Sequence, residues 1–176
     1  MSISNETREI VRKRANFACE FCGVTEINTG GLLTMDHFHP KSKGGSDELL
    51  NLVYCCARCN NYKFNYFPVS SDMPSLWNPR VEPSATHFLL LNNGQLQHLT
   101  EKGRFTIVRL RLNRMALVKY RLHRLYEEQQ QRAIAQYADL LNMQQRLNQQ
   151  LSTIVKEQNT LLKVHQQLLK ILIESK

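Results

Sequence analysis

The chain has 176 residues, of which 42% are apolar and 22% charged, and this composition excludes both a disordered chain and a membrane protein. Its 23 lysines and arginines outnumber its 15 acidic residues, and a net charge of +8 favours a polyanionic partner. No apolar signal region opens the sequence, so a cytoplasmic protein is expected.

Five cysteines form two CxxC pairs and leave one cysteine over. Cys19 and Cys22 make the first pair, Cys56 and Cys59 the second, and four thiolates in two such pairs suit tetrahedral zinc. Two disulfides are the alternative, but the odd cysteine count and the missing secretion signal argue against them. A redox CxxC would account for only one pair. We therefore expect a structural zinc site, with Cys55 pointing away from it as a small core residue.

The segment between the two cysteine pairs predicts two strands and a helix. Residues 32–38 have a strand pattern, Gly44-Gly45 interrupts it, and residues 49–54 have the pattern of a returning strand. From Arg58 onward the polar pattern fits a short helix. The expected assembly is a ββα unit that zinc clamps at both ends.

Residues 8–66 resemble the HNH endonucleases of the ββα-metal fold. The resemblance rests on several motifs in the family's order: Cys19-x-x-Cys22, Asp36-His37, Pro40 with Lys-Gly-Gly, Asn51-Leu52, and Cys56-x-x-Cys59-Asn60 followed by Lys63. His37 and Asn51 supply the first two letters of the family name. Asn60 stands at the position of the final histidine, where asparagine is a common variant.

The resemblance implies a site that hydrolyses phosphodiester bonds. His37 would be the general base, since an imidazole titrates near neutral pH. Asp36 and Asn60 would offer hard oxygen ligands to Mg²⁺ or Mn²⁺, which would neutralise the leaving oxygen. Neighbouring strand residues face apart, so Asp36 and His37 converge only if the strand ends there in a bend. Asn51 is expected to brace the loop that carries His37 through its side-chain amide.

Other residues near this motif are candidates for contact with nucleic acid. His39 could contact phosphate, help to bind the metal, or cap the turn before Pro40, and these three roles stay open. Lys63 and Arg58 lie close to Asn60 in the sequence and could hold phosphate oxygens, although solvated side chains would have the same pattern.

Residues 68–106 predict an accessory segment that contains every proline except Pro40. Residues 87–91 and 95–99 flank an Asn-Asn-Gly turn and are typical of a β-hairpin. The order of motifs here also resembles a stand-alone bacterial HNH subgroup common in cyanobacteria, which implies that the segment packs on the nuclease core. Arg80 and Arg104 could contact the DNA backbone or pair with a carboxylate.

The charge surplus is concentrated between Lys102 and Arg124, where eight basic residues occur without an acidic one. The absence of counter-charge favours contact with phosphate over a solvated helix face. Within this stretch Arg114, Arg121 and Arg124 flank one apolar helix face, and they are our candidates for DNA contact.

The remaining residues predict a long helical tail, because neither glycine nor proline follows Gly103 and Thr106 could serve as the N-cap. From Tyr137 to Leu172 apolar residues recur in a 3-4 spacing of about five heptads, the pattern of a coiled coil or helical bundle. Gln144, Gln158 and His165 occupy a positions, where they would weaken a dimer and set its register.

A helical hairpin that breaks near residues 127–132 is the alternative for this tail. Such a break would let the tail pack on the core or leave it to bind a different protein.

The sequence therefore predicts an α+β protein in three parts: a ββα-metal nuclease domain at residues 1–67, an accessory hairpin segment at 68–106, and a coiled-coil tail at 107–176. The expected function is a DNA endonuclease with structural Zn²⁺ and catalytic Mg²⁺ or Mn²⁺, which oligomerises through its tail. A non-cleaving zinc-bound adaptor and an RNA-cutting nuclease are the alternatives. The resemblance would suit a defence effector, a homing enzyme or a mobile-element passenger, and the sequence does not decide among them.

Overall fold

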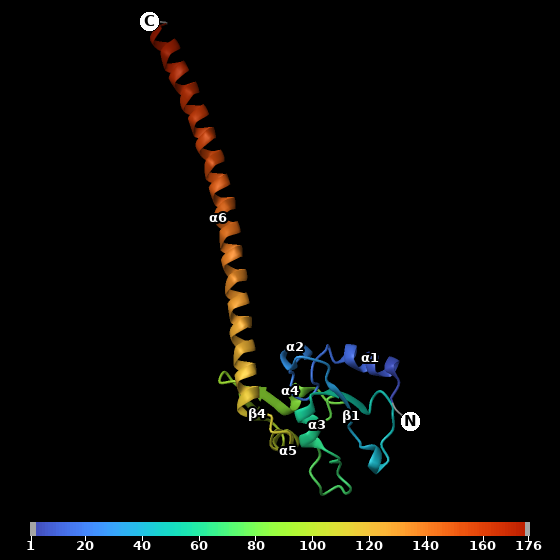
Figure 1. Cartoon of the computed structure of the whole chain (residues 1–176). Coiled ribbons are helices and arrows are strands. Elements are labelled where there is room, and N and C mark those ends of the chain that lie inside the picture. The colour runs from blue at the N-terminus through green and yellow to red at the C-terminus, as the bar shows by residue number, and fades with distance from the viewer. Residues whose placement is uncertain (1–2, 175–176) are drawn as a thin grey trace. The chain divides into compact units, whose positions relative to one another are not determined.

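The computed structural model describes residues 3–174, and the chain divides into two compact units (Figure 1). Unit 1 comprises Met1–Leu125 and unit 2 comprises Tyr126–Lys176. The expected nuclease domain, the accessory segment and the first turns of the tail therefore belong to one unit. The fold is mixed α+β, as the sequence predicts, with two small sheets and a long C-terminal helix.

The centre of unit 1 is a ββα arrangement between the cysteine pairs. Strands β1 (Thr34–His37) and β2 (Leu52–Cys55) pair antiparallel, and α3 (Ala57–Lys63) follows with Cys56 as its N-cap residue. Both strands are shorter than expected, because the chain bends at residues 38–39 and a 3-10 turn occupies Lys41–Lys43. The bend follows His37, and Asp36 and His37 are both still paired with β2.

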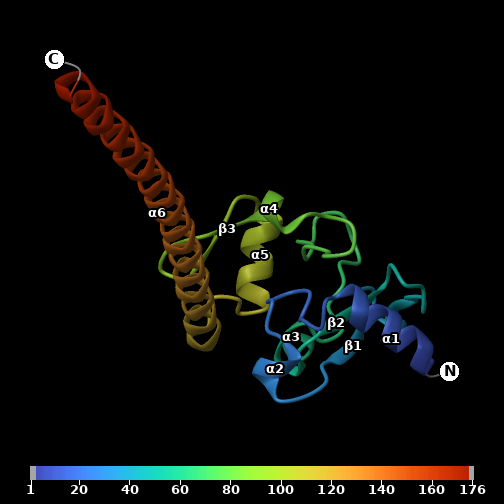
Figure 2. The same cartoon turned by 90° about the horizontal axis from the view of Figure 1, so that it is seen from above.

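Two helices precede the ββα arrangement in the chain. Helix α1 (Asn5–Arg14) packs against β2, as Figure 2 shows, and α2 (Glu26–Thr29) follows the first cysteine pair. Arg12 joins the two helices through a bidentate ion pair with Glu26, at 2.6 and 2.7 Å. The guanidinium lowers the pKa of the Glu26 carboxyl to about 2. The hydroxyl of Tyr54 donates to the same carboxylate and so ties both helices to the sheet.

The accessory segment forms the expected hairpin. After α4 (Ser84–His87), strands β3 (Phe88–Leu90) and β4 (Leu96–His98) pair antiparallel, and α5 (Glu101–Arg109) follows. The N-cap residue of α5 is Thr100, whose hydroxyl accepts from the backbone N–H of Gly103.

Thr106 is not the helix cap that the sequence suggested. It lies inside α5 and is fully buried, and its hydroxyl accepts from the backbone N–H of Trp77 at 2.8 Å while donating to the carbonyl of Lys102. Gly103 is required where α5 meets α4, because a Cβ there would lie 2.3 Å from the carbonyl oxygen of His87. These contacts lock the accessory segment onto α5.

One hydrophobic core joins the cysteine pairs to the accessory segment and to the start of the last helix. Trp77 lies at its centre, with Phe21 packed edge-on at 6.4 Å and Phe88 at 5.2 Å between ring centroids. Leu110 and Leu112 are fully buried in the same cluster. The accessory segment therefore packs on the nuclease core, as the resemblance implied.

The long helix α6 (Met115–Glu174) begins later than expected and is separated from α5 by the connector at residues 110–114. Arg111 in this connector has a left-handed φ of 49°. The alternative of a helical hairpin that breaks near residues 127–132 is wrong, since α6 is continuous there. The helix is interrupted instead at residues 110–114, where no glycine or proline marks the interruption in the sequence.

Arg121 has a structural role that corrects its expected contact with DNA. The side chain is buried, and its guanidinium donates to the carbonyl of Gly94 at 2.7 Å and to the carbonyl of Leu112. Burial removes the group from water, and these acceptors compensate for part of that cost. Arg121 thus ties α6 to the hairpin turn and to the connector.

Unit 2 is helical throughout its described part, and its apolar stripe is exposed. Tyr137 and the leucines and isoleucines at d positions up to Leu168 are 49–69% exposed. Leu172 continues the stripe, but its side chain lies outside what the structure describes. Among the described residues, no helix combines the length and apolarity needed to cross a membrane.

Candidate metal centre and active site

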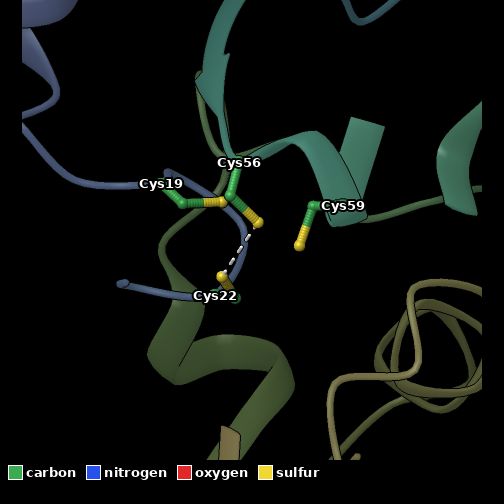
Figure 3. Close-up of side chains that lie close together, drawn as sticks. All are labelled: Cys19, Cys22, Cys56 and Cys59. Atoms are coloured by element: carbon green, nitrogen blue, oxygen red, sulfur yellow. Dashed lines mark hydrogen bonds between the residues drawn. The ribbon is translucent and has the colours of Figure 1, made fainter. Parts of the chain in front are cut away.

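The four cysteines of the two CxxC pairs converge on one point, as Figure 3 shows, and their sulfurs all lie within 4.8 Å of one another. Cys19 and Cys22 lie in a tight turn that is closed by the N–H of Gly23 donating to the carbonyl of Cys19. Cys56 and Cys59 stand at the junction of β2 and α3. All four are buried and none forms a disulfide.

The geometry of this cluster fits zinc. The sulfurs of Cys22 and Cys56 are 3.8 Å apart. A tetrahedral zinc with Zn–S bonds of ~2.3 Å would place its ligand sulfurs about 3.8 Å apart. Zinc binds cysteine sulfurs as thiolates and displaces their protons.

Cys55 behaves as the sequence predicts. It is fully buried and lies outside the four-cysteine cluster, with the hydroxyl of Thr34 at 3.7 Å from its sulfur. Burial raises the pKa of its thiol, so the group stays neutral.

The facing surfaces of β1 and α3 bring the two expected metal ligands to the same place. Thr34 and Asp36 are two residues apart on β1 and therefore share one face of the strand. The amide of Asn60 on α3 reaches the Thr34 hydroxyl at 3.4 Å, and the ammonium of Lys63 lies 2.9 Å from Asp36. Asn60 and Lys63 are three residues apart, so one face of α3 meets this face of β1.

Lys63 is a buried partner of the site, which contradicts the expected contact with nucleic acid. Its side chain is fully buried, and its ammonium donates to the carbonyl of His37 at 2.8 Å. The same ammonium forms an ion pair with the Oδ2 of Asp36 at 2.9 Å, and this oxygen is buried. Lys63 holds both the backbone of the candidate base and the carboxylate of the candidate metal ligand.

Asp36 and Asn60 have side chains that suit a divalent cation. Both are hard oxygen donors, which Mg²⁺ and Mn²⁺ prefer. The Oδ2 of Asp36 faces the ammonium of Lys63 at 2.9 Å, and no other described residue is a hydrogen-bond partner of Oδ2. Two protein ligands would leave the remaining positions to water and phosphate, as Mg²⁺ sites commonly do.

His37 has a carboxylate partner that sequence analysis missed. Its Nε2 lies 2.7 Å from Oδ1 of Asp47, and Lys41 pairs with the other oxygen of the same carboxylate at 2.5 Å. Hydrogen bonds from Lys41 and His37 lower the pKa of Asp47, which stays ionised. The carboxylate therefore orients the imidazole ring. The only feature of the sequence that points to Asp47 is that an acidic residue occurs in the Gly-Gly loop between the two strands.

Asn51 braces the loop in the way the sequence suggests. Its amide oxygen accepts from the backbone N–H of His39 at 2.7 Å, and its amide nitrogen donates to the carbonyls of His39 and Ser46. Gly45 permits this packing, because a Cβ there would lie 1.8 Å from the His39 carbonyl oxygen. Asn51 therefore acts on the loop that positions His37 and Asp47.

The other expected contacts with nucleic acid have different surroundings. The His39 ring stacks on Phe67 with centroids 3.9 Å apart, so one of its faces is covered. Arg114 is half-buried and donates to the carbonyls of Leu110 and Arg111 at 3.3 Å. Arg124 is exposed on α6. Arg80 pairs with Glu20 at 2.6 Å and Arg104 with Glu101 at 2.7 Å, which is the carboxylate pairing left open above.

Zinc should be needed for folding, with about one ion per chain by elemental analysis. Cys22→Ser and Cys59→Ser should lose the ion and the packed core, because structural zinc supplies ~10–16 kcal/mol in small zinc domains. Cys55→Ala is the matched control: it also removes a buried thiol, but it should keep the ion. Urea unfolding and zinc content measure both effects. A Cys22→Ser chain that retains zinc and melts like the parent would contradict the site.

Comparison with known families identifies the stretch that carries this geometry. Residues 19–65, about a quarter of the chain, match the family model described as HNH endonuclease. A search of curated proteins found no match. The matched residues run from the first cysteine of the zinc cluster to just beyond α3, and so include Asp36, His37, Asn51 and Asn60. Residues 19–65 therefore match the HNH endonuclease family, and the four-cysteine cluster is consistent with its zinc-binding type.

Proposed function

We propose that the protein is a metal-dependent endonuclease that hydrolyses phosphodiester bonds in DNA. The observation that carries this proposal is the pairing of His37 with Asp47 at the end of the strand that presents Asp36. A module that only binds nucleic acid needs zinc and positive charge, but it does not need an imidazole oriented by a carboxylate. The HNH family match supports a nuclease in general.

His37 is suited to remove a proton from the attacking water. With Nε2–H donating to Asp47, the ring is in the tautomer that leaves Nδ1 free to accept a proton. The carboxylate then stabilises the imidazolium that forms when the proton arrives. Asp47 lies within the loop that Asn51 braces, so the orientation of the base depends on that amide.

Asp36 and Asn60 would hold the catalytic ion, and Mg²⁺ or Mn²⁺ bound there would neutralise charge on the scissile phosphate and the leaving oxygen. Lys63 holds the carboxylate of Asp36 in place through their ion pair. Its contact with the His37 carbonyl fixes the distance between the two halves of the site.

We also propose that the chain self-associates through unit 2. The apolar stripe of this unit is about half exposed or more along its whole described length. A continuous apolar surface of this kind is unusual on a soluble monomer and marks an interaction site. The heptad spacing favours a second copy of the same helix as the partner. Two-fold pairing would supply two active sites, one for each strand of a duplex.

The free thiols of all five cysteines suit a reducing compartment such as the cytoplasm. A role in defence or in a mobile element stays a prediction from the resemblance. RNA as the substrate, and binding without cleavage, are the two alternatives that the experiments below separate.

Purified protein should nick plasmid DNA when Mg²⁺ or Mn²⁺ is added. His37→Ala should reduce the rate by roughly 10²–10⁴-fold, because that is the usual contribution of a general base. Asp36→Ala and Asn60→Ala should also cut poorly while their zinc content stays at the parent level. His98→Ala changes an exposed histidine of β4 and is the control. A parent chain that cuts RNA but not plasmid DNA would favour the RNA-cutting nuclease. A parent chain that cuts neither nucleic acid would favour the module that binds without cleavage.

Asp47→Asn should slow cleavage by roughly tenfold or more, because an amide cannot stabilise the imidazolium of His37. It should also change the tautomer of the neutral ring, which ¹⁵N chemical shifts of labelled protein report without any substrate. Glu48→Gln, an exposed change in the same loop, is the control. Unchanged tautomer and rate in Asp47→Asn would show that the carboxylate does not orient the base.

Light scattering should show a dimer or larger assembly at tens of micromolar protein. Leu147→Lys combined with Leu161→Lys should shift the full chain to a monomer, since each change places a charge in the apolar stripe. Gln149→Lys lies on the opposite face of the helix and should leave the assembly intact. A monomeric parent chain would overturn self-association.

A further inference from the structure

The basic stretch between Lys102 and Arg124 separates into groups once its partners are known. Lys102 and Arg104 are paired with carboxylates, at 2.5 and 2.7 Å, and Arg121 is buried against carbonyl groups. Arg109, Arg111 and Arg114 form no ion pair with a carboxylate in the part of the chain that the structure describes. Arg114 interacts electrostatically with Cys59 and Cys22 of the sulfur cluster. Arg109 and Arg111 therefore carry positive charge that no carboxylate of the described residues neutralises.

All three of these guanidinium groups lie on tyrosine rings. The Arg109 guanidinium lies 4.8 Å from the ring centroid of Tyr66, and those of Arg111 and Arg114 lie 4.9 and 5.7 Å from that of Tyr62. We call these five residues the arginine–tyrosine ladder. Stacking covers a face of each guanidinium. Arg109 also donates to the carbonyl of Lys63 at 3.4 Å, and Arg114 donates to the carbonyls of Leu110 and Arg111. The exposed Arg111 therefore has the guanidinium edge that is left to donate.

Arg111 occupies a position where the backbone favours glycine. Helix α5 ends in a Schellman motif, with the N–H of Leu112 donating to the carbonyl of Ile107 and that of Arg111 to Val108. The residue after the helix cap takes a left-handed conformation in this motif, and glycine is its usual occupant. Arg111 adopts φ of 49° there and is exposed. An exposed arginine in a strained position points to a use for its side chain.

The ladder lies next to the candidate site. Asn60 and Lys63 occupy the face of α3 that meets β1, and Tyr62 projects from a different flank of the same helix. A cleft of about 470 Å³ is lined by Thr34, Arg58 and Arg114, among others. Thr34 contacts Asn60 and Arg114 belongs to the ladder, so this cleft borders both surfaces.

We propose that the arginine–tyrosine ladder binds the phosphate backbone of the nucleic-acid strand that enters the active site, an assignment that rests on the proposed nuclease function. Guanidinium edges donate pairs of hydrogen bonds to phosphate oxygens and match their geometry. The tyrosine rings hold the guanidinium planes in place before the strand arrives, which reduces the entropy lost on binding. The contacts are to phosphate, so the ladder does not select a base sequence.

The test measures binding without cleavage, in the full-length His37→Ala chain. A labelled 30-bp DNA duplex, the matching single strand and the matching RNA duplex are titrated by fluorescence anisotropy between about 50 and 300 mM KCl. Arg111→Gln and Arg109→Gln should each reduce the slope of log affinity against log salt by about 0.9. The affinity should fall roughly eightfold at about 0.1 M salt for each lost contact. The probe whose affinity falls most in these variants identifies the form of nucleic acid that the ladder binds.

Arg104→Gln is the matched control. Arg104 lies on α5 in the same basic stretch and is exposed, but Glu101 already neutralises it. Its removal should leave the salt slope unchanged. An equal loss of slope in Arg104→Gln and in the ladder variants would mean that net charge alone drives binding, and it would overturn the ladder.

Arg111→Gly separates binding from stability. Glycine suits the left-handed conformation, so this variant should resist urea at least as well as the parent while it binds nucleic acid as weakly as Arg111→Gln. If the contact between Arg111 and Tyr62 only stabilises the fold, Arg111→Gly should have lower stability and unchanged binding. That result would overturn the proposal.

The two proposals fail in different ways. Ladder variants that bind like the His37→Ala chain would overturn the ladder, and a parent that cuts plasmid would still be a nuclease. Reduced binding in these variants together with a parent that does not cut would retain the ladder and overturn the nuclease. Absence of binding to all three probes would overturn the ladder.

Discussion

The rest of unit 1 depends on a convergence of four sulfurs within 4.8 Å. The first pair comes from a turn near the N-terminus and the second from the start of α3, so a metal there ties together segments more than thirty residues apart. Few other interactions of comparable strength are available, because the ββα unit alone buries little surface. The position of α3 decides where Asn60 lies, and the candidate site therefore inherits its geometry from the sulfur cluster.

A second constraint is electrostatic. A fully buried ammonium at Lys63 would be costly in isolation, and Asp36 and the carbonyl of His37 offset that cost. The contact also holds β1 and α3 together beside the candidate metal ligands. The buried ammonium of Lys63 thus contacts both the Asp36 carboxylate and the backbone of His37, two neighbouring residues whose side chains face apart on a strand.

The sequence was informative wherever a function depends on spacing. The CxxC pairs and the Asn51 amide are local patterns, and the cysteine cluster and the loop contacts of Asn51 are found where they were predicted. Asp47, Lys63 and Arg121 were missed or misassigned because their roles depend on contacts far along the chain. The connector at residues 110–114 was missed for a different reason: an arginine takes the left-handed position that glycine usually marks.

The sulfur cluster also couples the amount of folded protein to a nutrient. A metal that binds the folded chain and not the unfolded one shifts the folding equilibrium by mass action. Each binding event also displaces protons from thiols, so acid competes with the metal for the same four sulfurs. A cell short of zinc would accumulate chains that are synthesised but never assembled. Metal supply would then limit how much of the folded protein is present, before any inhibitor or partner acts.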